Sequence, residues 1–362
     1  MTTKPRIGIM TSGGDCAGLN AAIRAAVLHA EHSYGWEVVG IKNATQGLMS
    51  ETPQLIELST EKMSAHLLRE GGTILGAINN RNPYHFPLPD GTRVDRSAEV
   101  IANYHKLGLR GVIGIGGDGS LALLQRLTTQ GNIPMVAIPK TIDNDMVLTE
   151  TSIGFDTAVQ VATEALDRLQ PTAASHSRLM ILEVMGRDAG RIALAAGIAG
   201  GADIILIPEI PYKLAHIAAK IEQIRQRGRN FSLLVVAEAV KSESGESMMM
   251  QHHGGESRYG GIGHYLGHKL MEMTGAETRV TVLGHVQRGG QPSPQDRLIA
   301  SAFGVRAVDL IHQGKFNRMV AWSAGQVIDV PMADVAGKTR AADPKGIEVT
   351  TARGLGICLG DE

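Results

Sequence analysis

Short runs rich in β-branched and aliphatic residues alternate with helical patterns along almost the whole chain. The candidate strands are 6–10, 37–41, 111–115, 135–138, 179–184, 203–207, 232–236 and 279–283. The candidate helices between them are 19–30, 121–128, 157–169, 214–227 and 295–311. Strands that alternate with helices form βαβ units, which build parallel sheets. We therefore predict an α/β protein with two Rossmann-like domains, mostly parallel sheets, and an active site in the cleft between the domains.

The length and the hydrophobic content agree with two domains. The chain has 362 residues, 43% of them hydrophobic, which is enough to bury two cores. We expect residues 1–154 and about 287–330 to form one domain, and residues 155–286 and about 331–362 to form the other. In the candidate helix 157–169, Val161, Ala165, Leu166 and Leu169 recur at helical spacing, which predicts a face that packs in a core.

Charge and cysteine content exclude several classes of protein. With 35 basic and 36 acidic residues, the formal net charge is −1, which does not favour nucleic-acid or membrane-surface binding. Only Cys16 and Cys358 occur, so a disulfide scaffold or a thiolate metal site is not expected. The first residues are polar, and no apolar run reaches the about 18 residues of a membrane span. We expect a cytoplasmic protein whose partners are small molecules and further copies of itself.

Two stretches lack a regular pattern. Residues 241–261 are rich in Ser, Gly and Met, and we expect a mobile surface insertion there. The insertion contains His252 and His253, which could ligate a metal, although adjacent histidines in such a loop are more often solvated polar residues. Residues 79–94 carry Arg, Asn, Pro and Gly, which suggests a loop over the active site.

Glycines and carboxylates follow the strands of the first half, where open α/β sheets bind ligands. Residues 11–15 read Thr-Ser-Gly-Gly-Asp and 116–120 read Gly-Gly-Asp-Gly-Ser. A Gly-rich turn into a helix lets backbone N–H groups approach a phosphate. Residues 139–145 add Asp143 and Asp145, so that one carboxylate could act as a base and another could serve Mg²⁺. Each loop alone also fits simple chain geometry.

Asp143 and Asp145 are expected to have different tasks. One residue separates the two carboxylates in an extended segment, and we expect them to point to opposite sides of it. The alternative is an Asx turn capped by Asn144, in which neither carboxylate is functional.

Charged residues also mark the strand ends of the second half. Residues 183–187 read Glu-Val-Met-Gly-Arg, Glu238 follows another strand, and 284–290 read Gly-His-Val-Gln-Arg-Gly-Gly. Guanidinium groups match phosphate oxygens, and a carboxylate can accept hydrogen bonds from sugar hydroxyls. This combination suits a sugar phosphate. Each arginine alone also fits a surface ion pair, and His285 alone fits a structural role.

Taken together, the segments 11–15, 116–120, 139–145, 183–187 and 284–290 resemble the 6-phosphofructokinase family over roughly residues 5–315. The resemblance implies Mg²⁺-assisted transfer of a phosphoryl group from ATP to the 1-hydroxyl of fructose 6-phosphate, a step of glycolysis. It also implies an allosteric homotetramer, or a homodimer, in which sites are shared between subunits.

The resemblance further implies a role for individual residues. Asp143 would be the base, Thr141 would lie next to the transferred group, and Gly13 and Arg187 would stabilise that group. Asp118 and Asp145 would serve Mg²⁺. Donor contacts would come from Gly13, Gly117, Asp118, Gly119, Ser120, Arg81 and Lys140. Substrate contacts would come from Thr141, Asp143, Asp145, Met185, Gly186, Arg187, Glu238, His285 and Arg288, with Arg178 and Arg279 reaching across from a neighbouring subunit.

The family uses either ATP or pyrophosphate, and the sequence carries signals for both. Gly119 leaves room for a nucleotide α-phosphate, where pyrophosphate-using relatives place an acid. Lys140 stands where many ATP users carry Gly and pyrophosphate users carry Lys. Leu123 is bulky where Gly is common near the adenosine. We expect ATP, with pyrophosphate as the alternative.

Two further departures from the family pattern concern a loop and the effector site. The loop 76–83 is longer than the common pattern, in which an Arg bridges donor and sugar, and Arg81 is the natural candidate. Arg24, Asp203, Arg227 and Arg229 match the bacterial effector site, whereas Leu28 and Gln170 stand where Arg is usual. We therefore expect altered regulation.

Two other functions remain to be weighed. Residues 114–119 reach the Gly-x-Gly-x-x-Gly spacing of an NAD-dependent oxidoreductase, but Pro139 and Lys140 stand where an acid would take the ribose. A catalytically inactive sugar-phosphate sensor would keep the arginines and lose the carboxylates, and Asp118, Asp143 and Asp145 are all present.

Overall fold

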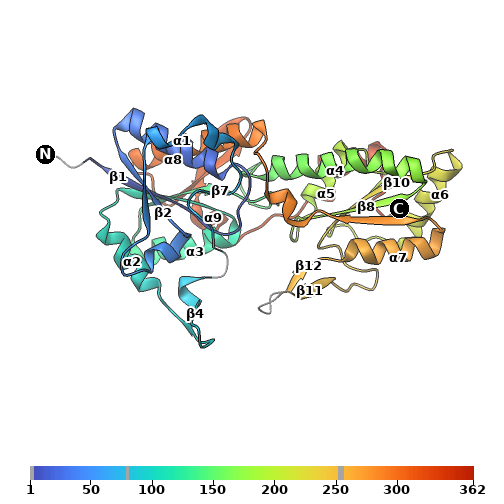
Figure 1. Ribbon diagram of the computed structural model, residues 1–362, viewed down its shortest axis with the longest axis horizontal. Helices are drawn as coiled ribbons and strands as arrows, with labels where there is room; N and C mark the ends of the chain where they lie inside the picture. The colour runs from blue at the N-terminus through green and yellow to red at the C-terminus, as the bar shows by residue number, and fades with distance from the viewer. Residues whose placement is uncertain (1–3, 79–80, 252–256) are drawn as a thin grey trace. The chain divides into compact units, whose positions relative to one another are not determined.

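The computed structural model of the chain describes residues 4–78, 81–251 and 257–362 and contains two compact units. Unit 1 comprises Met1–Thr157 and Arg288–Thr339, and unit 2 comprises Ala158–Gln287 and Arg340–Glu362 (Figure 1). Residues 331–339, which we expected in the second domain, thus belong to unit 1. They include helix α9 (Met332–Val335), which contacts helix α3 (Asp118–Gly131) of that unit.

Unit 1 is built on a seven-stranded sheet in the order β15-β14-β7-β6-β1-β2-β3. The strands are β1 (Arg6–Thr11), β2 (Glu37–Ile41), β3 (Leu55–Leu58), β6 (Gly111–Gly116), β7 (Met135–Pro139), β14 (Arg318–Ser323) and β15 (Gln326–Pro331). The pairs from β14 through β2 are parallel, and only the edge strands β3 and β15 are antiparallel to their neighbours. β6 and β7 are buried along their whole length, as expected of central parallel strands.

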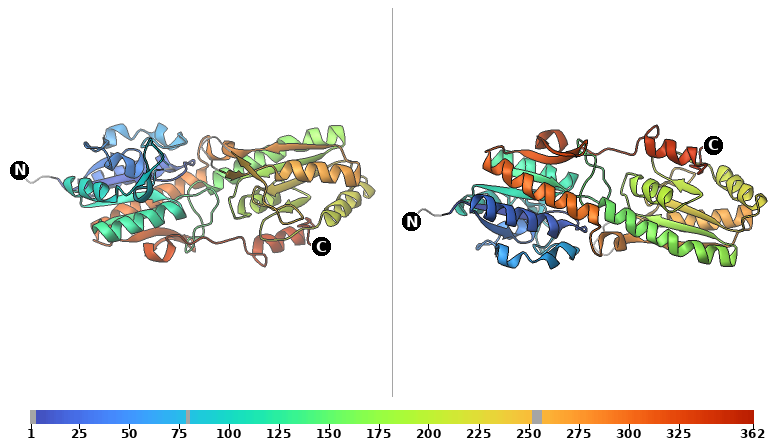
Figure 2. Two further views of the ribbon diagram at one scale, coloured as in Figure 1. Left: turned by 90° about the horizontal axis from the view of Figure 1, so that it is seen from below. Right: turned by 90° about the horizontal axis from the view of Figure 1, so that it is seen from above.

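The helices of unit 1 are α1 (Leu19–Tyr34), α2 (Ser97–Lys106), α3, α8 (Pro294–His312) and α9, with α4 (Phe155–His176) beginning there. α1 starts after Gly18 and ends before Gly35, both of which have a positive φ. α8 lies along α1 (Figure 2), and a Cβ on Gly304 would stand 2.6 Å from the carbonyl oxygen of Ala22. Glycine at this position therefore permits the close packing of the two helices.

Unit 2 contains a four-stranded, fully parallel sheet in the order β13-β8-β10-β9. The strands are β8 (Leu179–Val184), β9 (Ile204–Leu206), β10 (Ser232–Ala237) and β13 (Thr278–Val282). The helices are α5 (Arg191–Ala199), α6 (Leu214–Gln226), α7 (Ile262–Thr274), α10 (Ile347–Gly354) and most of α4. None of the helices in the described ranges combines the length and apolar character needed to cross a membrane.

The predicted α/β class is confirmed, and all eight predicted strands and five predicted helices are present with ends shifted by a few residues. Two details of α4 differ from the prediction. The helix continues through Pro171 to His176. Its most buried line runs through Ala158, Ala162 and Leu166, whereas Val161, Ala165 and Leu169 are only half-buried.

The two stretches that lack a pattern contain regular structure. Within 241–261, β11 (Met249–Gln251) and β12 (Ser257–Tyr259) pair as an antiparallel hairpin, so part of this stretch is regular, and its mobility stays a prediction. Within 79–94 there is a 3₁₀ turn, η4 (Pro83–His85), and a short pair, β4 (Phe86–Pro87) and β5 (Arg93–Val94). His252 and His253 lie outside the described residues, as do Asn79 and Asn80.

Candidate active site

Three loops of unit 1 meet at the carboxyl edge of its sheet. β1, β6 and β7 are adjacent and parallel, so the loops that follow them emerge on the same side. Two backbone hydrogen bonds continue the sheet into these loops. The Ser12 N–H donates to Ile115 O at 2.8 Å, and the Lys140 N–H donates to Gly116 O at 3.0 Å.

Glycines allow these loops to approach one another closely. Gly13 has φ +82°, and a Cβ there would lie 2.6 Å from Ser120 Oγ. A Cβ on Gly117 would lie 3.2 Å from the carbonyl oxygen of Lys140. The structure therefore brings together Gly13, Gly117, Ser120 and Lys140, four of the predicted donor-binding residues.

The amino end of α3 opens at this edge. Gly117 precedes the helix in an extended conformation, Asp118 is its first residue and is half-buried, and Gly119 is exposed with open space where a Cβ would be. The first N–H groups of a helix have no partner within the helix and carry a partial positive charge. An anionic phosphate is favoured at such an end.

Lys140 is buried behind the glycine loops. Its side chain is only 4% exposed and its Nζ donates to the carbonyl oxygen of Gly14. Burial lowers the pKa of the Lys140 ammonium, and the charge of Arg288 acts in the same direction, whereas Asp143 and Asp15 oppose it. Lys140 therefore holds the loop after β1 in the described structure.

Asp143 lies in a tight turn after β7. The Asp143 N–H donates to Thr141 Oγ1 at 3.1 Å, and the Thr141 hydroxyl donates to Asp143 Oδ2 at 3.3 Å. Asn144 follows with φ +49°, and its amide donates to Glu150 O at 3.1 Å. The segment is thus a turn in which the Thr141 side chain makes the closing hydrogen bonds. The sequence suggested either an extended segment or an Asx turn capped by Asn144, and the structure has neither.

Asp143 and Asp145 are both buried, at 7% and 4% exposure. Asp118 belongs to the loop next to theirs, since a Cβ on Gly117 would stand 3.8 Å from Thr141 Cβ. Within the described ranges, no three His, Cys, Asp or Glu side chains form a group that could hold a metal by themselves.

A cavity of about 460 Å³ opens beside the amino end of α3. Its lining residues include Gly119, Ser120 and Arg81 from the predicted donor site, together with Leu123. Among the described residues, the lining contains two arginines and no carboxylate: Ser12, Asn43, Ala44, Thr45, Gln46, Ile78, Arg81, Asn82, Tyr84, Gly119, Ser120, Ala122, Leu123 and Arg126. A cavity of this size and charge fits an anionic small molecule.

Two cavity residues were not predicted from the sequence. The guanidinium carbon of Arg126 lies 3.6 Å from the centroid of the Tyr84 ring, and the Tyr84 hydroxyl donates to Gln130 Oε1 at 2.8 Å. Guanidinium planes and aromatic rings are surfaces on which nucleobases stack. No local pattern points to this pair, because it joins a 3₁₀ turn to a helix far along the chain.

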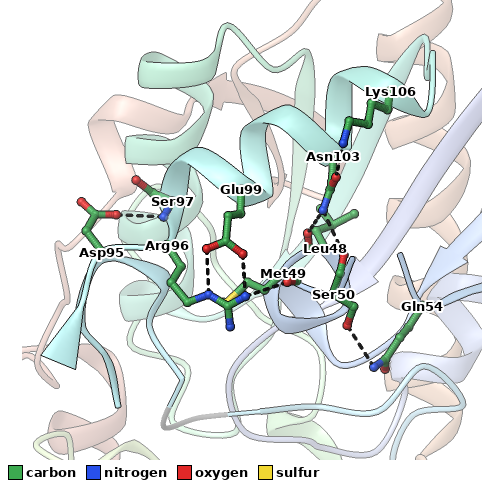
Figure 3. Close-up of polar contacts among 10 residues, drawn as sticks. All are labelled: Leu48, Met49, Ser50, Gln54, Asp95, Arg96, Ser97, Glu99, Asn103 and Lys106. Atoms are coloured by element: carbon green, nitrogen blue, oxygen red, sulfur yellow. Dashed lines mark hydrogen bonds and ion pairs between the residues drawn. The ribbon is translucent and has the colours of Figure 1, made fainter. Parts of the chain in front are cut away.

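One wall of the cavity is the 3₁₀ turn η1 (Ala44–Leu48), which α2 holds in place (Figure 3). The amide of Asn103 donates to Leu48 O at 2.8 Å and to Ser50 O at 3.0 Å. Arg96 donates to Met49 O at 2.8 Å and pairs with Glu99. These bonds satisfy carbonyl oxygens that the turn leaves unpaired.

Arg81 is exposed at the rim of this cavity, with its guanidinium carbon 5.7 Å from the centroid of the Phe86 ring. This position agrees with a donor contact. Its predicted bridging role between donor and sugar stays a prediction.

A second group of predicted residues gathers at the carboxyl edge of the unit 2 sheet. Glu238, after β10, accepts hydrogen bonds at Oε1 from the N–H groups of Gly186 at 3.3 Å and Arg187 at 3.0 Å. The Met185 N–H donates to Gln287 Oε1 at 2.8 Å. Gln287 is buried, and the sequence analysis missed it although it lies inside the predicted segment 284–290. His285 is exposed in the same segment.

Arg187 has an uncommon backbone conformation for a residue with a side chain, φ +51°. The preceding Gly186 is required, since a Cβ there would lie 2.4 Å from the carbonyl oxygen of Ala189. The two bonds to Glu238 hold this turn. Backbone strain that the surroundings maintain in this way is typical of functional loops.

Arg178 and Arg279 lie at the opposite edge of the same sheet. Arg178 directly precedes β8, and Arg279 is the second residue of β13. Both form ion pairs with Glu277, and the distance from Arg178 Nη2 to Glu277 Oε1 is 2.9 Å. The hydrogen bond from Arg178, with the charge of both arginines, lowers the pKa of Glu277. Within one chain these arginines are therefore apart from Met185, Arg187 and Glu238.

Arg288 lies in unit 1, where its Nη1 donates to Asp15 O at 3.0 Å. A Cβ on Gly14 would stand 2.5 Å from the same nitrogen. The sequence groups Arg288 with the sugar-phosphate residues of the second half. The structure places it against the glycine loop after β1.

The profile of the family described as Phosphofructokinase matches residues 6–311. The chain is 59% identical over 357 residues to "ATP-dependent 6-phosphofructokinase 1" of Synechocystis sp., covering 99% of each chain. It is 44% identical over 359 residues to "ATP-dependent 6-phosphofructokinase" of Chloroflexus aurantiacus, again covering 99% of each.

Solved structures of related proteins are similar in fold. The phosphofructokinase of Saccharomyces cerevisiae matches with a TM-score of 0.76 and 30% identity over 91% of this chain, which spans 45% of the yeast chain. A pyrophosphate-dependent phosphofructokinase of Nitrosospira multiformis matches with a TM-score of 0.80 over 99% of this chain and 92% of that chain. At 21% identity, the second match supports the fold alone.

Proposed function

The chain belongs to the phosphofructokinase family, and we propose that it transfers the terminal phosphoryl group of ATP to the 1-hydroxyl of fructose 6-phosphate. The product is fructose 1,6-bisphosphate. The observation that carries this proposal is the meeting of the loops after β1, β6 and β7 at the amino end of α3, next to the cavity of about 460 Å³.

The donor phosphates would lie on these glycine loops. Gly13 and Gly117 let the backbone approach, and the N–H groups at the start of α3 and the Ser120 hydroxyl supply donors. The buried ammonium of Lys140 lies behind the same loops and adds positive charge. Positioning and charge neutralisation supply most of the acceleration in phosphoryl transfer.

ATP is favoured over pyrophosphate because the cavity offers room beyond the phosphates. Gly119 leaves open space at its entrance, and Arg126 on Tyr84 offers a stacking surface for a base. Pyrophosphate needs neither feature. The names of the curated relatives also specify ATP. The pyrophosphate-dependent reaction is the second candidate, because Lys140 stands where pyrophosphate users carry Lys.

Asp143 is proposed as the base that takes the proton from the 1-hydroxyl of the sugar. Its carboxylate is buried and its orientation is fixed by Thr141 at 3.3 Å. A base that is held in place needs no reorganisation when the hydroxyl attacks. Thr141 would lie next to the transferred group, and Gly13 and Arg187 would stabilise its negative charge.

Mg²⁺ fits the carboxylates Asp118 and Asp145, since it binds oxygen ligands and commonly takes one or two carboxylates with phosphate oxygens and waters. The lack of a three-residue ligand group in the described ranges is consistent with this mode. When bound, the ion would neutralise charge that develops on the phosphates. Asp118 at the start of α3 and the buried Asp145 are the residues that would hold it.

Fructose 6-phosphate would be bound by Met185, Gly186, Glu238 and His285, with Arg288 assisting. Glu238 keeps one carboxylate oxygen on the Gly186–Arg187 turn. Arg178 and Arg279 would bind the sugar phosphate of a neighbouring subunit in a homotetramer or homodimer. An allosteric response and a cytoplasmic location also stay predictions.

The reaction is tested with a coupled assay that follows fructose 1,6-bisphosphate. The protein is incubated with fructose 6-phosphate and Mg²⁺, with either ATP or pyrophosphate as donor. We expect turnover with ATP and at most traces with pyrophosphate. Turnover with pyrophosphate alone would replace the proposed donor, and no product with either donor would refute the kinase. Reduction of NAD by the protein would instead favour the oxidoreductase.

A further inference from the structure

The hairpin β11–β12 (Figure 1) is bonded through a side chain to the loop that carries Arg187. The hydroxyl of Tyr259, the last residue of β12, donates to Asp188 Oδ1 at 2.8 Å. The other oxygen of this carboxylate, Oδ2, lies 3.8 Å from Arg187 Nε. Asp188 therefore connects the tyrosine of the hairpin to the guanidinium of Arg187.

The base of the hairpin is fixed to the strand that leads into the same loop. The carboxylate of Glu183, at the end of β8, is buried and accepts from the N–H groups of Gly261 at 3.1 Å and Gly263 at 2.8 Å. Tyr259 is paired with Met249 across the hairpin. The position of the tyrosine relative to residues 185–188 is thus set by bonds on both sides of it.

The backbone of Arg187 is held by Glu238, but its long side chain is 53% exposed. Exposed arginine side chains have many rotamers, so burial alone does not direct the guanidinium. At 3.8 Å the Asp188 carboxylate is an ion-pair partner of Arg187 and not a hydrogen-bond acceptor, so it attracts the guanidinium to one side only if the carboxylate is itself fixed. Asp188 is 70% exposed, and the bond from Tyr259 is the contact that fixes it.

We propose that Tyr259 is a positioning residue for phosphoryl transfer, which holds Asp188 so that Asp188 orients the guanidinium of Arg187 toward the transferred phosphoryl group. This inference rests on the proposed function, because the role of Arg187 belongs to that proposal. It gives the hairpin a task in the reaction.

The ionisation of Tyr259 agrees with this geometry. The hydrogen bond to Asp188 raises the pKa of the Tyr259 phenol, burial and the charges of Asp188 and Glu238 raise it further, and the charge of Arg187 lowers it. The phenol therefore stays protonated, and able to donate, across the neutral range.

The test compares kcat and KM of Y259F with those of the wild type in the ATP-dependent assay. We expect kcat to fall roughly tenfold, as for loss of a hydrogen bond to a charged group at an exposed site, with both KM values within about twofold. Y212F is the matched control. The hydroxyl of Tyr212, in the same unit, is buried and has no hydrogen-bond partner among the described residues, so its removal is expected to leave kcat unchanged.

A second comparison shows whether the effect passes through Arg187. In an R187K background, the lysine has no Nε atom that Asp188 could orient. Adding Y259F to this background is therefore expected to lower kcat by less than about twofold. D188N, which keeps the tyrosine, is expected to lose about as much activity as Y259F. The double variant Y259F/D188N is expected to lose much less than the product of the two single effects.

The outcomes separate this inference from the function on which it rests. An inactive wild type refutes the proposed function. An active wild type in which Y259F and D188N both behave like Y212F overturns the inference alone. An equal effect of Y259F in the wild-type and R187K backgrounds, with a lowered melting temperature, also overturns it, because the hairpin would then act only on stability.

Discussion

Glycine and a few buried polar groups determine what the carboxyl edge of the unit 1 sheet can bind. Gly13 and Gly117 leave little space for a side chain, since a Cβ on Gly13 would stand 2.6 Å from Ser120 Oγ and a Cβ on Gly117 would stand 3.2 Å from the carbonyl oxygen of Lys140. Gly119 is different, because nothing lies within 4 Å of the place of its Cβ. The first two glycines are needed by the protein itself, whereas Gly119 leaves room for a ligand.

Gly119 provides a test of the donor. In G119D the new carboxylate would face the phosphates of ATP, and like charges brought close together cost several kcal/mol. We expect the KM for ATP to rise by about tenfold or more, with an unchanged melting temperature because the site is open. G119A is the control and should bind ATP nearly as the wild type does. An unaltered KM for ATP in G119D would show that the phosphates of ATP do not lie next to this residue.

The sequence predicted most of these residues and missed others for a physical reason. Gly13, Asp118 and Asp143 follow strands, so their place at the edge could be inferred from chain order. Arg126 on Tyr84 and the bond from Met185 to Gln287 depend on contacts between distant segments. Such contacts leave no periodic signal in one sequence.

At the scale of elements, α2 shapes the cavity by holding η1. Asn103 is buried and its amide bonds to two carbonyl oxygens, Leu48 O and Ser50 O. In N103A these oxygens lose their donor, so we expect the free energy of unfolding to fall by about 1–3 kcal/mol and the KM for ATP to rise. Urea unfolding and steady-state kinetics measure the two effects.

The control for this prediction is Q54A, in the same region (Figure 3). Gln54 donates to Ser50 Oγ at 3.3 Å and accepts from the Asn43 amide at 3.2 Å, both on the exposed side, where water replaces the lost contacts. We expect a change within about 0.5 kcal/mol. Equal effects of N103A and Q54A on stability would contradict a specific role of Asn103.

Asp329 joins β15 to β14 and α8 through Arg318 and Arg306, each at 2.8 Å. Burial raises the pKa of Asp329, but the bonds from the two arginines outweigh it and hold the pKa below its usual value. A lowered pKa in the folded state stabilises the protein above the unfolded value near about 3.9, and this stability is lost as the pH falls through the folded pKa.

We therefore expect D329N to be less stable than the wild type by about 1–3 kcal/mol at neutral pH, with the difference shrinking as the pH falls below about 3.9. Urea unfolding at several pH values gives the comparison. D334N, at an exposed carboxylate on α9, is the control and should match the wild type. A stability difference for D329N that does not depend on pH would refute the ionic contribution.

Several of the elements that the sequence missed are short or lie near a sheet edge, although the apolar helix α5 and the 13-residue helix α7 were missed as well. The hairpins β11–β12 and β14–β15 and the helix α2 were not predicted, whereas the buried strands β1, β6, β8 and β10 were. Buried parallel strands read as continuous apolar runs, but a three-residue strand gives too few residues for a pattern. Tertiary anchors such as Glu183 decide whether these short strands form.

On the scale of the whole molecule, we expect the regulation to differ from that of typical bacterial members. Unit 2 has a cavity of about 500 Å³ whose lining includes Asp203, Arg227 and Arg229, and Arg229 pairs with Asp203. The family resemblance predicts these residues as part of an effector site, in which Leu28 and Gln170 replace two expected arginines. We expect neither ADP nor phosphoenolpyruvate to shift the fructose 6-phosphate saturation curve as in typical bacterial members. A clear shift with either would contradict altered regulation.

The central claim is that Asp143 is the base of an ATP-dependent phosphoryl transfer. The most direct measurement is kcat of D143N beside that of the wild type, with fructose 6-phosphate binding measured on both. Because a positioned base contributes about 10²–10⁴-fold, we expect kcat to fall by that factor while the dissociation constant of the sugar changes less than about threefold. D143N that turns over at a rate within a few-fold of the wild type would contradict the account.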